Sequence, residues 1–268
     1  MSEGTVAGPA GEIAWRSVGD GPPLVLVNGY AATAADWDPG FLAALGGRSE
    51  VFCPDNRGMG GSGGSVDGLS VEAMAADLVA LLDALELPSV DLAGWSMGGF
   101  VAQEVAALAP ERVRKLVLLA TSGGGPDAVP STVESWRALT DHGGTPGEQA
   151  RRLLDLLFPA AVAERVYADF GDIVAAARAA LDPKALSAQE AAMIAWLRGP
   201  AAERLAAIRA PALIATGTED LVIPAANSAL LAGALADSWL ARFPGGGHAF
   251  MAQEPVRVAA LITAFLDR

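Results

Sequence analysis

The stretch Gly94-Trp95-Ser96-Met97-Gly98 decides the fold expected of this chain. An apolar run, residues 90–93, precedes it, and a helix-like stretch, residues 100–108, follows it. A serine on a sharp turn between a strand and a helix projects its hydroxyl above the edge of a sheet, and glycines tolerate the close backbone approach that such a turn requires. The first N–H groups of the helix point at any negative charge that forms there. The pattern therefore predicts that Ser96 is a nucleophile.

Short apolar runs alternate with amphipathic stretches along the chain. Continuous apolarity is typical of parallel strands that are covered on both faces. The runs are residues 24–27, 51–54, 90–93, 116–119, 212–215 and 239–243. Between them, apolar residues recur every three or four positions, with Ser70 as the expected N-cap of one helix and Pro255 near the start of the last. This order predicts an α/β fold with a doubly wound, mostly parallel sheet, whose reactive groups lie at the carboxyl ends of the strands.

The alternation stops between residues 122 and 207. This segment contains no convincing strand and is rich in Ala, Leu, Glu and Arg. Its helix-prone parts are residues 131–140, 147–157, 160–181 and 187–198. A crossover connection needs only about a dozen residues, so the much longer insertion predicts a helical cap over the strand ends. We expect residues 1–121 and 208–268 to form the core and residues 122–207 to form the cap.

Composition excludes several classes of partner. The chain has 268 residues, enough for one large α/β domain or for a core with an inserted subdomain. Its 18 Lys and Arg against 31 Asp and Glu give a net charge of −13, which repels nucleic acid and anionic membranes. No signal peptide or membrane-spanning run is evident, so we expect a cytoplasmic protein. The oligomeric state stays open.

Neither a disulfide nor a bound metal or cofactor is expected. Cys53 is the one cysteine, and its place in an apolar run predicts a buried, inert thiol. No histidine pair or cysteine cluster suggests a metal. Residues 58–63 fit the pattern G-x-G-x-x-G, but a flexible polar loop follows them where a dinucleotide site would need a helix.

Only two histidines can serve as a base for Ser96. His248 follows the last predicted strand and three glycines, so it lies on the same edge of the sheet as Ser96. Imidazole suits general-base catalysis because its unperturbed pKa is near neutrality. His142 lies in a polar turn of the predicted cap, where we expect a solvated side chain.

A base of this kind needs an acidic group that orients it and stabilises its charged form. Asp220 follows the strand predicted at residues 212–215 and is the expected partner of His248. Glu219 is its main competitor, and Asp127 is a weaker one. Acyl transfer also needs donors for the oxyanion. We expect these to be the backbone N–H groups of Met97, at the helix start, and Tyr30, in the loop after residues 24–27.

These blocks resemble the α/β-hydrolase superfamily, in particular its small capped serine hydrolases: carboxylesterases, enol-lactonases and the cofactor-free haloperoxidase branch. The resemblance covers about residues 10–121 and 208–268. It rests on Asn28-Gly29-Tyr30, Asp55-Asn56-Arg57-Gly58, Gly94-Trp95-Ser96-Met97-Gly98-Gly99, Gly217-Thr218-Glu219-Asp220 and Gly247-His248. It implies a sheet of the eight-stranded type with the cap inserted after the sixth strand.

Three positions limit or refine what the resemblance implies. Asn28 stands where most relatives have a histidine that organises the oxyanion loop, and its amide can hydrogen-bond in that place. Arg57 is expected to hold the loop after its strand, with contact to a substrate carboxylate as the alternative. Ser96 excludes haloalkane dehalogenases and epoxide hydrolases, which use an aspartate nucleophile.

Aromatic residues are the candidate walls of a substrate pocket. Trp95 and Phe250 flank the expected catalytic residues, and Trp136, Phe158 and Trp196 lie in the predicted cap. Together they predict a mostly apolar site. The insertion has no obvious basic cluster, which argues against a long anionic substrate.

The expected function is that of a serine hydrolase that cleaves small apolar carboxylic esters or lactones through an acyl-enzyme, without a cofactor. The same three residues would also support peracid formation from hydrogen peroxide, as in a perhydrolase, or hydrolysis of a carbon–carbon bond. A third alternative is a non-catalytic small-molecule receptor, because folds and even residues are reused.

Overall fold

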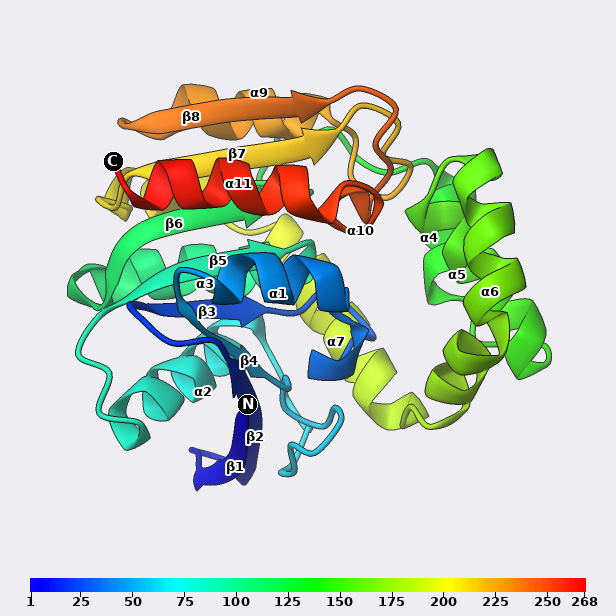
Figure 1. Ribbon diagram of the computed structural model, residues 1–268, viewed down its shortest axis with the longest axis horizontal. Coiled ribbons are helices and arrows are strands. Elements are labelled where there is room, and N and C mark those ends of the chain that lie inside the picture. The colour runs from blue at the N-terminus through cyan, green and yellow to red at the C-terminus, as the bar shows by residue number, and fades with distance from the viewer.

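An eight-stranded sheet runs through the centre of the computed structural model, which describes all residues, 1–268 (Figure 1). The spatial order of the strands is β1-β2-β4-β3-β5-β6-β7-β8. Their bounds are β1 Ser2–Ala7, β2 Glu12–Val18, β3 Pro23–Val27, β4 Glu50–Pro54, β5 Val90–Trp95, β6 Val113–Leu119, β7 Ala212–Gly217 and β8 Ser238–Phe243. The pairs β1–β2 and β2–β4 are antiparallel, and all other pairs are parallel. The predicted fold class is therefore confirmed.

All six strands predicted from apolar runs are present, whereas β1 and β2 were not located individually. Both lie at one edge of the sheet, and their residues are partly exposed. Strands with a face exposed to water carry polar residues, so β1 and β2 lack the continuous apolar signal of β3 to β7.

Helices cover both faces of the sheet (Figure 1). They are α1 Pro39–Gly46, α2 Val71–Ala84, α3 Met97–Leu108, α9 Ala226–Ala234, α10 Phe250–Gln253 and α11 Pro255–Leu266, with 3-10 turns at Ala34–Asp36 and Pro110–Arg112. Ser70 caps α2 as predicted, since its hydroxyl accepts a hydrogen bond from the N–H of Ala73 at 3.1 Å. Pro255 occupies the first turn of α11.

The two faces of the sheet support two hydrophobic cores. Leu24 and Leu26 of β3 pack with α1 and α11, whereas Val25 and Val27 pack with α2 and α3. Successive residues of a strand point to opposite faces. The strand is apolar at every position because both of its faces are covered.

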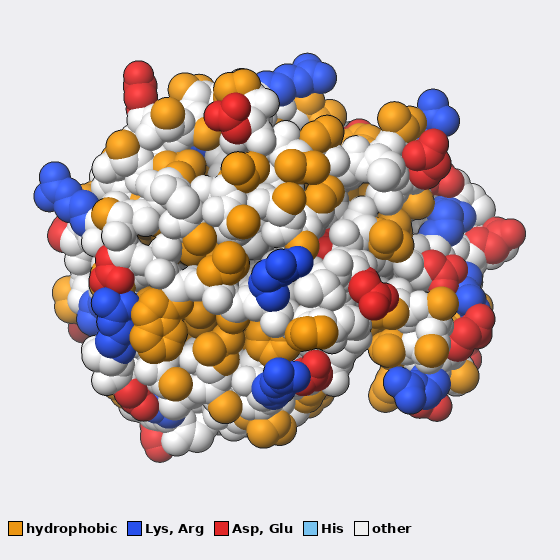
Figure 2. Space-filling view, turned by 90° about the horizontal axis from the view of Figure 1, so that it is seen from above, with side chains coloured by type: hydrophobic (Ala, Val, Ile, Leu, Met, Phe, Trp, Pro, Cys, Tyr) orange, Lys and Arg blue, Asp and Glu red, His pale blue; other side chains and the backbone are white.

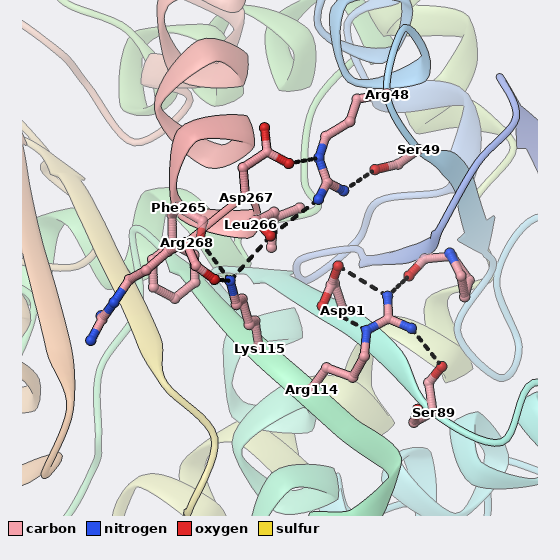
Figure 3. Close-up of polar contacts among 11 residues, drawn as sticks. Arg48, Ser49, Ser89, Asp91, Arg114, Lys115, Phe265, Leu266, Asp267 and Arg268 are labelled. Atoms are coloured by element: carbon pink, nitrogen blue, oxygen red, sulfur yellow. Dashed lines mark hydrogen bonds and ion pairs between the residues drawn. The ribbon is translucent and has the colours of Figure 1, made fainter.

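The C-terminal end of α11 is tied to the sheet by cations (Figure 3). Lys115 of β6 donates to the carbonyl oxygens of Phe265, Leu266 and Arg268 at 3.0, 3.1 and 2.8 Å. Arg48 donates to the Leu266 carbonyl and to the Asp267 carboxylate. Cations at a helix C-terminus satisfy carbonyls that have no intrahelical donor and complement the helix dipole.

Between β6 and β7 the chain forms only helices. They are α4 Val133–Thr140, α5 Pro146–Leu157, α6 Ala160–Ala179, α7 Pro183–Leu197 and α8 Ala201–Ala207. The four predicted helical segments are confirmed, and α8 is additional. Helices α4, α5 and α6 form a lobe beyond the carboxyl ends of the strands, and a recess separates part of this lobe from the main body (Figures 1 and 2). The division into a core and a cap stays a prediction.

The distribution of charge on the surface and the length and hydropathy of the helices are relevant to binding partners. On the face seen in Figure 2, Lys and Arg side chains are scattered among acidic and apolar ones and form no basic patch. None of the helices is both long and apolar enough to cross a lipid bilayer.

Candidate active site

Ser96 is the single residue between β5 and α3, and its backbone is strained. Its φ of 56° and ψ of −121° lie in a region that residues with a Cβ rarely adopt. A Cβ at Gly94 would collide with the carbonyl oxygen of Gly98, and one at Gly98 would collide with that of Val27. The Ser96 N–H donates to the Leu119 carbonyl at 2.9 Å. The turn therefore requires both glycines of the pentapeptide and is held by β6.

His248 and Asp220 meet at the same edge of the sheet. His248 follows β8 and Asp220 follows β7, and Nδ1 of the imidazole lies 2.8 Å from Oδ2 of the carboxylate. Both residues are buried. The other carboxylate oxygen, Oδ1, accepts hydrogen bonds from the N–H groups of Val222 and Ile223, each at 2.8 Å. The two backbone donors fix the carboxylate, and the carboxylate in turn fixes the ring.

The sequence competitors of Asp220 do not make this contact. Glu219 and Asp127 are both exposed. The single hydrogen bond of the His248 imidazole goes to Asp220, which leaves Nε2 without a protein partner. His248 and Ser96 line one cavity. The Trp95 indole donates to the His248 carbonyl oxygen at 3.0 Å, so the loop after β8 is tied to the end of β5.

The loop after β3 passes directly against Ser96. A Cβ built on Gly29 would lie 3.2 Å from Cβ of Ser96. The N–H of Ala31 is taken by the Gln189 side chain of α7 at 3.0 Å, whereas the N–H of Tyr30 makes no hydrogen bond within the protein. Met97 is the first residue of α3, where backbone N–H groups have no intrahelical acceptor. Two backbone donors are thus available beside Ser96.

Asn28 holds this loop against β4. Its side-chain amide donates to the Pro54 carbonyl at 3.3 Å, and its own carbonyl oxygen accepts from Asn56 at 3.2 Å. The residue that replaces the more usual histidine is therefore buried and fixes the backbone next to Tyr30.

Ser96 lies between two cavities. The larger has a volume of about 490 Å³ and is lined by Ser96, His248 and mainly apolar side chains. Helices α5 and α6 supply much of its wall through Leu153, Leu154, Leu157, Val166 and Val174. The smaller has a volume of about 200 Å³ and reaches Ser96 between Phe100, Met193 and Val222. Leu139 lines both cavities.

Three of the five predicted aromatic wall residues line these cavities, and two do not. Trp95 and Phe158 line the larger cavity, and Trp136 lines the smaller. The prediction was wrong for Phe250 and Trp196. Phe250 begins α10, which turns its ring into the core against Phe243 at 4.9 Å. Trp196 stacks on Phe100 at 4.3 Å and donates its indole N–H to Glu104 at 2.6 Å.

His142 is not the solvated loop residue expected from its polar sequence context. Its Nε2 lies 2.8 Å from the Tyr30 hydroxyl, and its Nδ1 lies 3.2 Å from Nη2 of Arg178 on α6. Burial and the neighbouring Arg178 charge lower the pKa of His142. The turn looks polar in sequence, but the lobe folds it onto the loop after β3.

Arg178 is the cavity residue that sequence reasoning missed. It lies in an otherwise apolar run, Val-Ala-Ala-Ala-Arg-Ala-Ala-Leu from 174 to 181, and it lines the larger cavity. Arg178 is the only charged residue between Asp172 and Asp182, and this is the signal that could have located it. An apolar stretch of helix is expected to be buried, and charged residues are rarely buried.

Arg57 and Cys53, two further residues singled out in the sequence, lie outside the two cavities and make contacts that support the fold. Arg57 forms two hydrogen bonds with the Asp77 carboxylate, as expected of a residue that holds its loop. Burial raises the pKa of the Cys53 thiol to about 12, as expected of an inert cysteine. No helix opens on residues 58–63, so the requirement of a dinucleotide site is not met.

Comparisons with known proteins agree with this architecture. The alpha/beta hydrolase family model matches residues 24–261. RutD of Variovorax paradoxus (strain S110), a candidate carbamate hydrolase, is 33% identical over 252 residues, 93% of each chain. The 2-hydroxymuconate semialdehyde hydrolase of Pseudomonas sp. (strain CF600) is 31% identical over 92% of this chain and 88% of the relative. A thermophilic esterase from Thermogutta terrifontis is 25% identical, with a TM-score of 0.82 over 100% of this chain and 98% of that one.

A mostly parallel eight-stranded sheet with a serine at a tight strand-to-helix turn defines an α/β hydrolase. The chain belongs to the alpha/beta hydrolase family, and the resemblance drawn from its sequence blocks is confirmed. Hydrolysis is the activity that the names of these relatives share.

Proposed function

We propose that this protein is a serine hydrolase that cleaves carboxylic esters or lactones through an acyl-enzyme. One observation supports the proposal above all: His248, which the buried Asp220 holds, lines the same cavity as Ser96 of the strained turn. A serine hydroxyl is a weak nucleophile unless a base lies beside it, and a base works best when a third group orients it.

In the proposed mechanism, Oγ of Ser96 attacks the substrate carbonyl carbon while Nε2 of His248 takes the hydroxyl proton. Asp220 accepts the hydrogen bond from Nδ1 and stabilises the imidazolium. The carbonyl oxygen becomes an oxyanion, which accepts hydrogen bonds from the N–H groups of Tyr30 and Met97. Loss of one such donor typically costs about 3–4 kcal/mol in the transition state.

The imidazolium then returns the proton to the leaving alkoxide as the carbon–oxygen bond breaks. A water molecule attacks the acyl-enzyme, with His248 again as the base, and releases the acid and Ser96. Because the Nε2 atom has no protein partner in the resting structure, it is available for both proton transfers.

The two cavities suggest how an ester would be divided. The larger, apolar cavity is suited to one side of the ester and the smaller cavity to the other, with the carbonyl at Ser96 between them. In this proposal residues 122–207 act as the cap, because α4, α5 and α6 supply residues to the cavity walls and thereby select the substrate.

A panel of short-acyl 4-nitrophenyl esters and lactones tests the proposal. We expect turnover by the wild type, a loss of about 10⁴-fold or more in kcat/KM for Ser96→Ala, and no loss for Ser65→Ala on an exposed loop. A fluorophosphonate probe should label Ser96 in the wild type and leave Ser96→Ala unlabelled. Full esterase activity in Ser96→Ala would contradict the proposal.

The second candidate bond is a carbamate, which the 33% identity to RutD over 93% of both chains favours. The same residues would act, with His248 protonating a nitrogen leaving group in place of an alkoxide. Ammonia release from a primary carbamate, measured beside ester turnover, distinguishes the two. A kcat/KM that is higher for the carbamate than for every ester would identify the protein as a carbamate hydrolase instead of an esterase.

A further inference from the structure

Arg178 presents a buried cation to the larger cavity without an acidic partner. The residue is 8% exposed and lines the cavity together with Ser96. Its guanidinium forms no ion pair, and its only hydrogen-bond partner is Nδ1 of His142 at 3.2 Å. Its Nε is buried and has no hydrogen-bond partner at all. Buried guanidinium groups are normally paired with carboxylates, so this one has unused binding capacity.

Neither of the two carboxylates that line the cavity with Arg178 forms an ion pair with it, although the charge of nearby Asp36 favours the guanidinium. Asp36 also lines the cavity, but its Oδ2 accepts hydrogen bonds from the N–H and the hydroxyl of Thr33, at 2.6 and 2.9 Å. Asp38 lines the cavity too, and its Oδ1 accepts from the N–H of Phe41 at 2.8 Å. Asp36 belongs to the capping box of a 3-10 turn and Asp38 is the N-cap of α1, so both carboxylates are engaged elsewhere and the arginine fork stays open to a ligand.

His142 sets the direction of hydrogen bonding in this cluster. A guanidinium only donates, so Nδ1 of His142 must accept from Arg178, and the ring proton lies on Nε2. Nε2 then donates to the Tyr30 oxygen, and the Tyr30 O–H is free to donate elsewhere. Burial and the nearby Glu190 raise the pKa of Tyr30, so its hydroxyl stays protonated. Tyr30 and Arg178 thus both offer donors.

The position of Tyr30 links this cluster to Ser96. Its backbone follows Gly29, which packs against Ser96, and its ring extends to His142. Tyr30 and Arg178 both line the cavity that holds Ser96 and His248. A ligand whose carbonyl lies at Ser96 would therefore extend along an apolar wall toward two or more unpaired donors.

We propose that Arg178 and the Tyr30 hydroxyl bind a free carboxylate, and that the substrates are esters or lactones that carry one, such as half-esters of dicarboxylic acids. A planar guanidinium matches the two oxygens of a carboxylate, and a water-poor pocket strengthens the bond. A single buried arginine suffices, so the lack of a basic cluster in the sequence does not exclude an anionic substrate. The substrate class rests on the proposed function, whereas carboxylate binding does not.

Equilibrium binding to the non-reactive Ser96→Ala protein tests the carboxylate site directly. Calorimetry would compare monomethyl succinate, glutarate and adipate with their neutral dimethyl esters. We expect at least tenfold tighter binding of the monoanion for at least one chain length. Arg178→Met in the same background should abolish this preference, whereas Arg165→Met, on the exposed side of the same helix, should keep it. No preference at any length, or a preference that survives Arg178→Met, overturns the proposal.

Kinetics then separate this site from the proposed reaction. For the chain length that binds best, kcat/KM for the mono-4-nitrophenyl ester should fall at least tenfold in Arg178→Met. The value for a neutral 4-nitrophenyl ester of similar length should fall less, so that the ratio of the two values drops at least fivefold, and a melting curve shows that the variant folds. Equal losses for both esters contradict the site. Absence of turnover for both esters in the wild type contradicts the serine-esterase proposal alone, since the calorimetry decides carboxylate binding independently.

Discussion

Asp220 and His248 follow neighbouring parallel strands, β7 and β8, and a 2.8 Å contact joins their side chains although 28 residues separate them. Parallel strands place their carboxyl ends at one edge of the sheet, so residues that follow such strands are close in space. The same edge carries Ser96 after β5. The arrangement makes the contribution of each residue testable.

Asp220→Asn should lower kcat for an ester by about 10³–10⁴-fold, because an amide can donate to Nδ1 and favour the wrong tautomer of His248. The fold should persist, since the new side-chain oxygen can still accept from Val222 and Ile223. Steady-state kinetics with a melting curve check both statements. Glu219→Gln, on an exposed neighbour, is the matched control and should leave kcat unchanged. A small effect of Asp220→Asn would contradict the proposed role of Asp220.

Arg178→Met should raise the melting temperature. Burial of an unpaired guanidinium costs several kcal/mol, whereas the hydrogen bond to His142 contributes only about 1 kcal/mol. The net gain should be about 1 kcal/mol or more, equivalent to roughly 2–4 °C for a chain of this size. Thermal unfolding without ligand measures it, with Arg165→Met as the control. A lower melting temperature would show that the guanidinium is stabilised by the fold itself.

Stability should depend on pH through His142. Burial and Arg178 lower the pKa of His142 in the folded protein, and the partial opposition of Asp141 does not reverse this. The unfolded chain binds a proton at a pKa of about 6.5, so the contribution of His142 is complete above that pH and is lost as the pH falls toward the lowered pKa. The melting temperature of His142→Gln should therefore fall less than that of the wild type between about pH 7 and about pH 5. Parallel curves for the two proteins would contradict the neutral state of His142.

Lys115→Met should destabilise the fold without changing catalysis. Lys115 satisfies three carbonyl oxygens at the end of α11 (Figure 3). It lies near the start of β6, whereas Ser96 follows the end of the parallel strand β5, so the two residues are at opposite ends of the sheet. Loss of these charge-assisted bonds should cost about 1.5–3 kcal/mol, measured as a lower denaturant midpoint with an unchanged slope. Arg257→Met removes an exposed ion pair with Glu254 and should cost less than about 1 kcal/mol. Equal effects of the two variants would contradict the anchoring role of Lys115.

Local sequence was sufficient wherever one contiguous segment encodes the structure. The strands from β3 to β7 were predictable because continuous apolar runs mark strands buried on both faces, and β8 was predictable from its apolar run although most of its residues are partly or fully exposed. The Ser96 turn was predictable because only glycine fits at Gly94 and Gly98. Strands β1 and β2, the two outermost on one side of the sheet, lack this signal because their residues are partly exposed to water.

Local sequence failed where the packing of distant helices sets the outcome. Phe250 is two residues from His248 but points into the core, because α10 begins there. His142 lies in a turn of polar composition, yet the lobe brings it against Tyr30, 112 residues away. Neither arrangement is encoded by the composition of the segment itself.

The sequence by itself determined the family, the sheet and the edge on which Ser96, Asp220 and His248 lie, because hydrophobic period and backbone requirements act within a few residues. Only the tertiary structure decided which acid contacts His248, which aromatic rings line the cavities and that Arg178 lies in one of them unpaired. The Asp220 contact depends on how the loops after β7 and β8 fold, and the cavity features depend on how α4 to α7 pack against the loops of the sheet. Packing angles between segments far apart in the chain leave no periodic signal in any one segment.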